Sequence, residues 1–245
     1  MHYELSTIGS FHINHNEDAY LITEIGNHHI LMAVLDGCSM GKESHFASTL
    51  ILKILRKIST EISYKAFLEK IDKGADEYLR EIMEQLFQEL KFLKNHLLLE
   101  VEEILSTLIL GILNKKEKQA ELITIGDGLI CCNGILYEYE QDDKPDYLGY
   151  HLAEDFSVWW QKQNQQLSLK QVEDLSISTD GIFTFKKFDN RVYESIQEEQ
   201  IAAYFLIDRQ WEGQAKMFSK KLSEIERIFG LRPSDDLTIL RVINS

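Results

Sequence analysis

The sequence predicts a layered α+β sandwich, in which strands and helices are segregated along the chain. Two short strands come first, two long amphipathic helices follow, and then come several short strands, another helix and a last strand. Single strands do not alternate with single helices in this order, so antiparallel sheets covered by helices fit better than a parallel sheet. The 245 residues show no linker, internal repeat or low-complexity segment, which predicts one domain over residues 1–245.

The first half of the chain contains two strands and two helices. Residues 19–25 (AYLITEI) and 29–35 (HILMAVL) are apolar, β-rich runs separated by a short turn signal. Beyond Gly41, apolar residues recur at steps of three and four, which predicts a helix to about Ile58. A second helix is predicted over roughly 75–103, because it has one apolar face and a charged opposite face.

The second half is richer in strands. Short runs of β-forming residues, separated by Gly and Asn, predict four strands: 105–113, 120–125, 129–132 and 135–140. Another strand is predicted at 174–179 (DLSIST), after a polar connection. A helix near 211–229 ends at Gly230, a residue favoured at helix C-termini. The last predicted strand is Leu237–Ile243.

Composition excludes several classes of partner. The chain has 26 basic and 40 acidic residues, a net charge of −14, which disfavours nucleic acid and anionic membrane surfaces. Its longest apolar stretches are too short to cross a bilayer, and its N-terminus lacks the layout of a signal peptide. Three cysteines without spaced pairs indicate a reducing compartment. We therefore expect a cytoplasmic protein that binds neither nucleic acid nor membrane.

Acidic residues recur at the ends of the predicted strands. They are the single acids Asp36, Asp127 and Asp180, and the pairs Glu17–Asp18 and Asp235–Asp236. One Asp-Gly sequence is typical of an ordinary turn. Five such coincidences indicate a cluster, and gathered carboxylates have raised pKa values unless cations neutralise them. Oxygen ligands without clustered His or Cys suit Mg²⁺ or Mn²⁺, and two such ions could support phosphoryl transfer or hydrolysis.

Five motifs in this order, NEDA, VLDG, TIGDG, STDGI and SDDLTIL, resemble those of the protein phosphatase 2C family of metal-dependent Ser/Thr phosphatases. The resemblance runs from about Gly9 to Val242. It implies a four-layer α-β-β-α sandwich of two packed antiparallel sheets flanked by helix pairs. It also implies hydrolysis of phosphoserine and phosphothreonine in a phosphorylated protein substrate, by a water that bridges two Mn²⁺ or Mg²⁺ ions. A third ion and the oligomeric state stay open.

The same resemblance implies a role for each acid. Asp36 matches the aspartate that bridges both ions, and Asp180 matches a ligand of one of them. The other residues that match metal ligands are Glu17, Gly37 through its carbonyl, and Asp235. Asp18 matches an acid that braces the ligands, and Asp127 matches a motif that we interpret as structural.

The sequence departs from the family pattern where substrate would bind. Ile13 stands where the family usually has an Arg that grips the substrate phosphate. The family's Gly-Gly loop is replaced by DGCSMGKES, with Cys38 where eukaryotic members carry a His. His12, His15 and Lys42 are the candidates to supply the missing positive charge.

The sequence allows two alternatives to a phosphatase. The segment GCSMGKE is similar to a phosphate-binding loop, but Asp36 stands where that loop needs its first glycine and Glu43 where it needs Ser or Thr. The second alternative is a pseudophosphatase that acts as a binding or scaffold module. The missing Arg favours it, whereas the intact acid set opposes it, because a scaffold has no physical need to gather repelling carboxylates.

Overall fold

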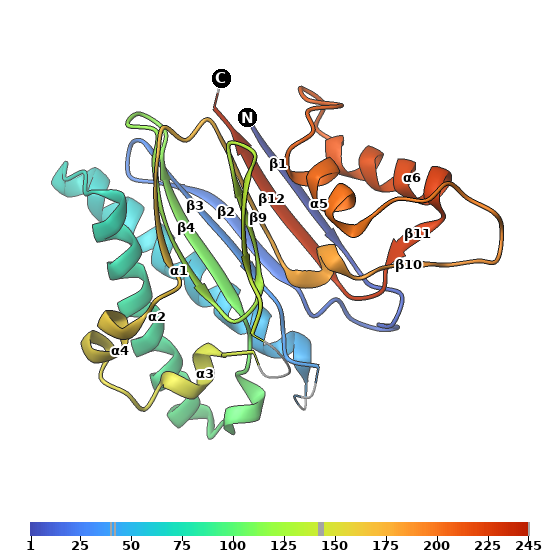
Figure 1. Ribbon diagram of the computed structural model, residues 1–245. Coiled ribbons are helices and arrows are strands. Elements are labelled where there is room, and N and C mark those ends of the chain that lie inside the picture. Colours follow the sequence, from blue (N-terminus) through green and yellow to red (C-terminus); the bar gives the residue numbers. More distant parts are fainter. Residues whose placement is uncertain (40, 42, 142–144, 245) are drawn as a thin grey trace.

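Two five-stranded antiparallel sheets pack face to face, and helices cover both outer faces (Figure 1). This computed structural model describes residues 1–39, 41, 43–141 and 145–244. Both sheets are antiparallel throughout. The predicted four-layer α-β-β-α sandwich is confirmed.

The first sheet joins the two ends of the chain to its middle. Its strands, in spatial order, are β1 (His2–Thr7), β12 (Leu237–Ile243), β9 (Asp174–Ser178), β6 (Gly128–Cys132) and β7 (Ile135–Tyr139). The second sheet has the order β2 (Ala19–Ile25), β3 (His29–Leu35), β4 (Leu108–Asn114), β5 (Gln119–Ile125) and β8 (Gln166–Lys170). β1 pairs with β12, so the N- and C-termini lie side by side (Figure 1).

A helix pair covers each sheet. The long helices α1 (Ser44–Glu69) and α2 (Ala75–Leu97) lie on the second sheet, and α5 (Glu198–Leu206) and α6 (Met217–Phe229) lie on the first. The remaining short elements are η1 (Val101–Glu103), α3 (Leu148–His151), α4 (Phe156–Lys162), η2 (Asp180–Phe183), β10 (Phe185–Lys187) and β11 (Leu231–Pro233). In the described part of the chain, no helix has the length and apolar composition that a membrane span requires.

The apolar residues form a separate layer on each side of each sheet. Strand β3 is buried along its whole length, because alternate side chains face opposite layers. Leu31 and Ala33 pack against α1 and α2, whereas Met32 and Val34 pack against the first sheet. This double burial explains why the HILMAVL run is apolar throughout rather than alternating.

The predicted helices differ from the observed ones at their ends. α1 continues to Glu69 rather than ending near Ile58, because Ile62 extends its buried stripe by another turn. The helix predicted over 75–103 ends at Leu97, and the separate turn η1 follows it. The helix predicted near 211–229 begins only at Met217.

Several other elements differ from the prediction. The strand predicted at 105–113 starts at Leu108, since the residues before it contact the loop after β3. Three predicted strands, β2, β3 and β12, have the expected bounds. The elements that were not predicted are β1, α3, α4, β8, η2, β10, α5 and β11.

Candidate metal centre

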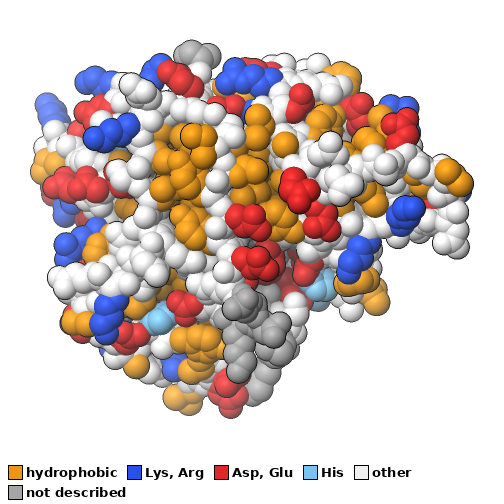
Figure 2. All heavy atoms as spheres, viewed as in Figure 1, with side chains coloured by type: hydrophobic (Ala, Val, Ile, Leu, Met, Phe, Trp, Pro, Cys, Tyr) orange, Lys and Arg blue, Asp and Glu red, His pale blue; other side chains and the backbone are white. Residues whose placement is uncertain are grey.

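Four strand ends that carry acids meet at one end of the sandwich. The start of β2 lies beside the end of β3, because Ala19 pairs with Leu35. In the first sheet the start of β12 lies beside the end of β9, because Ile239 pairs with Ser178. Asp18 precedes β2, Asp36 follows β3, and the acids 180 and 235–236 flank the other two strand ends. Figure 2 shows acidic side chains gathered in the middle of the face in view.

The hydrogen bond between Asp18 and Thr179 ties the two sheets together at this point. The Thr179 hydroxyl donates to Asp18 Oδ2 over 2.8 Å, and the same hydroxyl oxygen accepts the backbone N–H of Thr238 over 3.0 Å. Asp18 is 8% exposed, and its other oxygen, Oδ1, is buried without a hydrogen-bond partner among the described residues. A buried carboxylate oxygen without a donor is costly, unless a cation or an added proton compensates its charge.

Asp236 organises the backbone around the cluster. Its side chain is fully buried and accepts N–H groups from Gly9, over 2.7 Å, and from Glu17. His12 Nδ1 lies 2.9 Å from Asp236 Oδ2. Sequence reasoning placed Asp236 at the mouth of the last strand but gave it no role. In the structure it fixes the loop that carries Glu17.

The segment after β3 is fixed from both sides. The Thr107 N–H donates to the Asp36 carbonyl over 2.9 Å, and the Asp36 N–H donates to the Thr107 hydroxyl over 3.2 Å. Gly37 N–H donates to the Glu17 carbonyl over 3.2 Å. A Cβ atom at Gly37 would lie 2.1 Å from the Ser44 carbonyl oxygen, so only glycine fits here. The turn after Asp36 is therefore set by the close approach of α1.

Glu17 lies at the N-terminal end of α1. Its carboxylate accepts a hydrogen bond from the Ser39 hydroxyl over 2.8 Å and another from the Ser44 hydroxyl. His12 Nε2 is 3.9 Å away. An anion is stabilised at a helix N-terminus. Sequence reasoning found Glu17 but missed both serines, which lie in or beside the helix start that replaces the family's glycine loop.

The first sheet determines the positions of Asp180 and Asp235. Asp180 begins η2 directly after β9, and a Cβ atom at Gly181 would lie 1.8 Å from the Asp236 carbonyl oxygen. Asp235 Oδ1 accepts the N–H of Asp236 over 2.8 Å, and 42% of the Asp235 side chain is exposed. Asp235 is therefore partly exposed.

Burial and mutual repulsion raise the pKa values of three acids in the cluster. Burial, followed by the charges of Asp18, Asp180 and Asp235, raises the pKa of Asp36 well above its ordinary value. Burial raises the pKa of Asp18 to about 8, although the Thr179 hydroxyl opposes this shift. The pKa of Asp180 rises to about 6, through burial and then the charges of Asp235 and Asp127. These three carboxyl groups therefore keep their protons to a higher pH than ordinary aspartates do.

The donor set suits hard divalent ions. Carboxylates and a backbone carbonyl are the ligands of Mg²⁺ and Mn²⁺, and neither His nor Cys is needed. The orphaned oxygen of Asp18 and the raised pKa values fit a site that a cation would complete. As the described side chains stand, no three His, Cys, Asp or Glu groups are close enough to hold one metal ion.

The metal-free protein should lose stability as the pH rises. Between the ordinary Asp value of 3.8 and the raised values of Asp180 and Asp18, the folded state holds protons that the unfolded chain has released. The free energy of unfolding then falls with pH from about 4 to about 8. We expect a lower urea midpoint in EDTA at pH 8 than at pH 5.

Asp18→Asn provides the control for this prediction, because it removes the buried acid whose pKa is raised to about 8. The urea midpoint of this variant should fall less between pH 5 and pH 8. A wild-type midpoint that is constant or rises with pH across this window would contradict the raised pKa values.

The candidate phosphate-binding residues are dispersed. His12 Nδ1 lies 2.9 Å from Asp236 Oδ2; burial alone would lower the pKa of His12, but the adjacent Asp236 carboxylate and the charges of Glu17 and Asp235 raise it. His15 is exposed and stacks on His45 with ring centroids 4.3 Å apart. Ile13 is 90% exposed. Lys42 lies outside the described residues.

Asp127 borders a cavity beside the cluster. The cavity has a volume of about 410 Å³, and Asp180 and Thr184 also line it. Three glutamates complete its acidic wall: Glu138, Glu140 and Glu198. Asp127 thus faces the same space as Asp180, which goes beyond the structural role that the sequence indicated.

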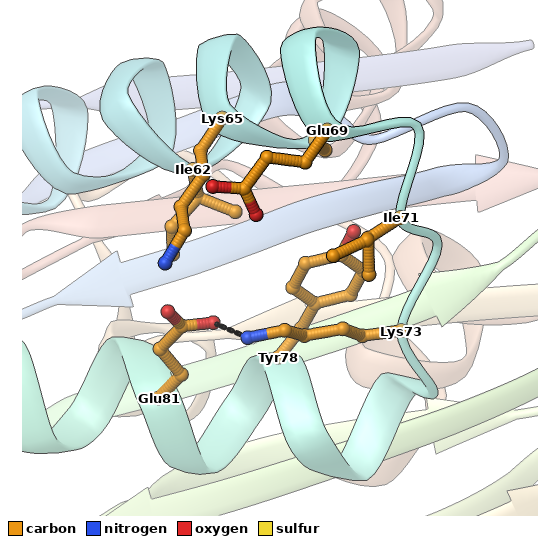
Figure 3. A pocket seen from close by; sticks show the side chains of 8 residues that line it. Ile62, Lys65, Glu69, Ile71, Lys73, Tyr78 and Glu81 are labelled. Carbon is orange, nitrogen blue, oxygen red and sulfur yellow. Dashed lines mark hydrogen bonds and ion pairs between the residues drawn. The ribbon is translucent and has the colours of Figure 1, made fainter.

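A second cavity lies at the opposite end of the sandwich. It is enclosed between the end of α1 and the start of α2 and holds only about 20 Å³ (Figure 3). Lys73 and Glu81 form an ion pair of 2.8 Å across it, and the buried Tyr78 ring forms one wall. A space that holds one water molecule is too small for a substrate.

Comparisons with known proteins identify the family and the fold of the chain. Residues 8–225 match the sequence model of the family described as protein phosphatase 2C. A search of curated protein sequences found no significant match. Among solved structures, the serine/threonine phosphatase Stp1 of Staphylococcus aureus is similar, with 12% identity, a TM-score of 0.62, and coverage of 100% of this chain and 94% of Stp1.

Two further solved structures share the fold. The PP2C domain of SiaA from Pseudomonas aeruginosa has 14% identity and a TM-score of 0.61, covering 100% of this chain and 86% of that domain. The phosphatase domain and regulatory fragment of SpoIIE from Bacillus subtilis has 16% identity and a TM-score of 0.56. That match covers 99% of this chain, which spans only 62% of the SpoIIE chain. At these identities the likeness shows the fold alone.

Proposed function

This chain belongs to the protein phosphatase 2C family, and we propose that it hydrolyses phosphoserine and phosphothreonine in proteins with two divalent ions, Mn²⁺ or Mg²⁺. One observation supports this function above the others. Acids from four strand ends meet at one end of the sandwich, and the pKa values of three of them are raised. Repulsion among these carboxylates lowers the stability of the metal-free fold, and bound cations would offset it.

Each acid has a place in this proposal. Asp36 would lie between the two ions, with Glu17 and the Gly37 carbonyl on one side and Asp180 and Asp235 on the other. When bound, the ions would activate a bridging water for in-line attack on phosphorus and neutralise charge on the phosphoryl oxygens.

Other residues of the chain hold this arrangement. Asp18 is held by Thr179, and Asp236 fixes the backbone of Glu17, so both acids would position the ligands. Ile13 carries no charge, so another group would have to supply the positive charge that binds the substrate phosphate.

Phosphate release from phosphopeptides tests the function. We expect the full chain to dephosphorylate peptides that contain phosphoserine or phosphothreonine in millimolar Mn²⁺, but not in EDTA. Phosphotyrosine peptides of the same sequence should be poorer substrates. If no phosphopeptide is hydrolysed with either metal, the proposal fails and the binding-module alternative gains support.

Ile13→Arg should improve substrate binding. An Arg at a phosphate contact supplies a charge-assisted hydrogen bond of about 1.5–3 kcal/mol. Because Ile13 is 90% exposed, the larger side chain fits without crowding the core. We expect KM for a phosphopeptide to fall about tenfold or more, with little change in kcat, which is the signature of uniform binding.

Ile13→Gln is the matched control, because it is polar and uncharged and should leave KM unchanged. If His12 or Lys42 already supplies the positive charge, then His12→Ala or Lys42→Ala should raise KM instead. If KM is the same in all these variants, the substrate phosphate does not bind beside the loop between β1 and β2.

A further inference from the structure

A groove on the outer face of α6 is lined by positively charged side chains. It encloses about 510 Å³, and Lys216, Lys220 and Arg227 line it together with Trp211. The three cations are exposed, whereas Met217, Phe218 and Ile225 of the same helix face the core. The groove shares no residue with the candidate metal centre.

The three cations form one stripe along the helix. Lys216 directly precedes α6, and the other two follow it by 4 and 11 residues, which places all three on one side of a helix. At a rise of 1.5 Å per residue, the stripe is roughly 16 Å long. Ser219 and Ser223 lie between the charges and add hydroxyl groups to the groove.

Within the described residues, none of these three cations has a carboxylate within 4 Å. Glu224 also lines the groove, where its carboxylate accepts a hydrogen bond of 2.7 Å from the Tyr204 hydroxyl, whereas Glu226 pairs with Arg232 over 2.9 Å. The lining of the groove therefore carries three cations and one carboxylate and is net positive, in a chain whose net charge is −14.

Trp211 forms the wall at the start of the stripe. Its backbone has a φ of 69°, an uncommon conformation for a bulky residue. The Lys220 ammonium lies 4.5 Å from the centre of the indole ring, a cation–π distance. Trp and Arg are the residues that most often dominate protein–protein binding energy.

We propose that this groove binds an acidic, extended peptide segment of a protein partner. A stripe of 16 Å matches about five residues of extended chain at 3.3 Å each. Carboxylates of the segment would pair with the three cations, and an apolar side chain would contact the indole. Nucleic acid and anionic membrane extend well beyond the groove, and both would meet the acidic remainder of the protein.

A library of octapeptides built from Asp, Glu, Leu, Phe, Lys and Gly is the probe. We expect the immobilised full chain to enrich peptides with three or more acids, and fluorescence anisotropy to show binding that weakens with salt. The double variant Lys216→Glu, Arg227→Glu should weaken the affinity for the best peptide at least tenfold.

Lys53→Glu, Lys65→Glu is the matched control, because it makes the same charge change at two exposed positions of α1. It should leave the affinity within twofold of wild type, and circular dichroism should show that both variants fold. The proposal is overturned if acidic peptides are not enriched. Equal losses of affinity in the two double variants, or no loss in the α6 variant, would overturn it as well.

Discussion

We expect Asp36→Asn to reduce Mn²⁺-dependent phosphatase turnover at least a hundredfold. The charges of Asp18, Asp180 and Asp235 act on Asp36, and in the proposed mechanism Asp36 is the ligand that both ions share. An amide has nearly the shape of a carboxylate but carries no charge, so it cannot hold two divalent ions together. The measurement is the initial rate of p-nitrophenyl phosphate hydrolysis over a range of Mn²⁺ concentrations.

The same variant should remain folded, and in EDTA at pH 8 it should melt at or above the wild-type temperature. Burial and the facing carboxylates raise the pKa of Asp36, so its ionised form destabilises the metal-free protein. Asp76→Asn, in the exposed first turn of α2, is the matched control and should keep full activity. Undiminished turnover in Asp36→Asn would refute the two-ion mechanism.

Arg241→Ala should destabilise the fold by about 3–5 kcal/mol. Arg241 is completely buried in the first sheet, and its guanidinium donates to both carboxylate oxygens of Asp174 over 2.9 and 2.7 Å. It also donates to the carbonyls of Phe205, Ile207 and Asp208 at the end of α5. Its loss leaves the buried Asp174 with the longer contact of 3.4 Å to Arg209, and three carbonyls without this donor.

Urea unfolding measures this effect, with Arg232→Ala as the control. Arg232 forms an exposed ion pair with Glu226, so its removal should cost less than about 1 kcal/mol. Similar midpoints for the two variants would show that Arg241 does not anchor α5 to the sheet.

The sequence predicted elements whose signals are local. β2 and β3 are dense apolar runs that flank a turn, and the apolar stripe of α2 repeats from Ala75 to Leu90, so local composition and periodicity identified them. β1 was missed because only Tyr3 and Leu5 of its six residues are buried, and its register depends on β12 at the far end of the chain. Such long-range pairing leaves almost no local signal.

The site was predictable to a similar extent. Acids after apolar runs indicated the strand ends that cluster. The order of the motifs suggested a role for each acid, and these roles stay proposals. The partners of these acids could not be predicted, because Thr179, Ser44 and Asp236 reach them only through tertiary contacts. A hydroxyl or carboxylate that acts across two sheets has no characteristic spacing in the sequence.

Thermal unfolding with and without Mn²⁺ tests most directly that the acid cluster is a divalent-cation centre. An ion that binds only the folded state stabilises it by about 2.7 kcal/mol at a hundredfold excess over its dissociation constant. For a chain of this size, that is a rise in Tm of roughly 5–10 °C over the value in EDTA. The rise should occur in the wild-type protein and disappear in Asp36→Asn. Equal melting temperatures of the wild-type protein in Mn²⁺ and in EDTA would contradict a metal centre at these strand ends.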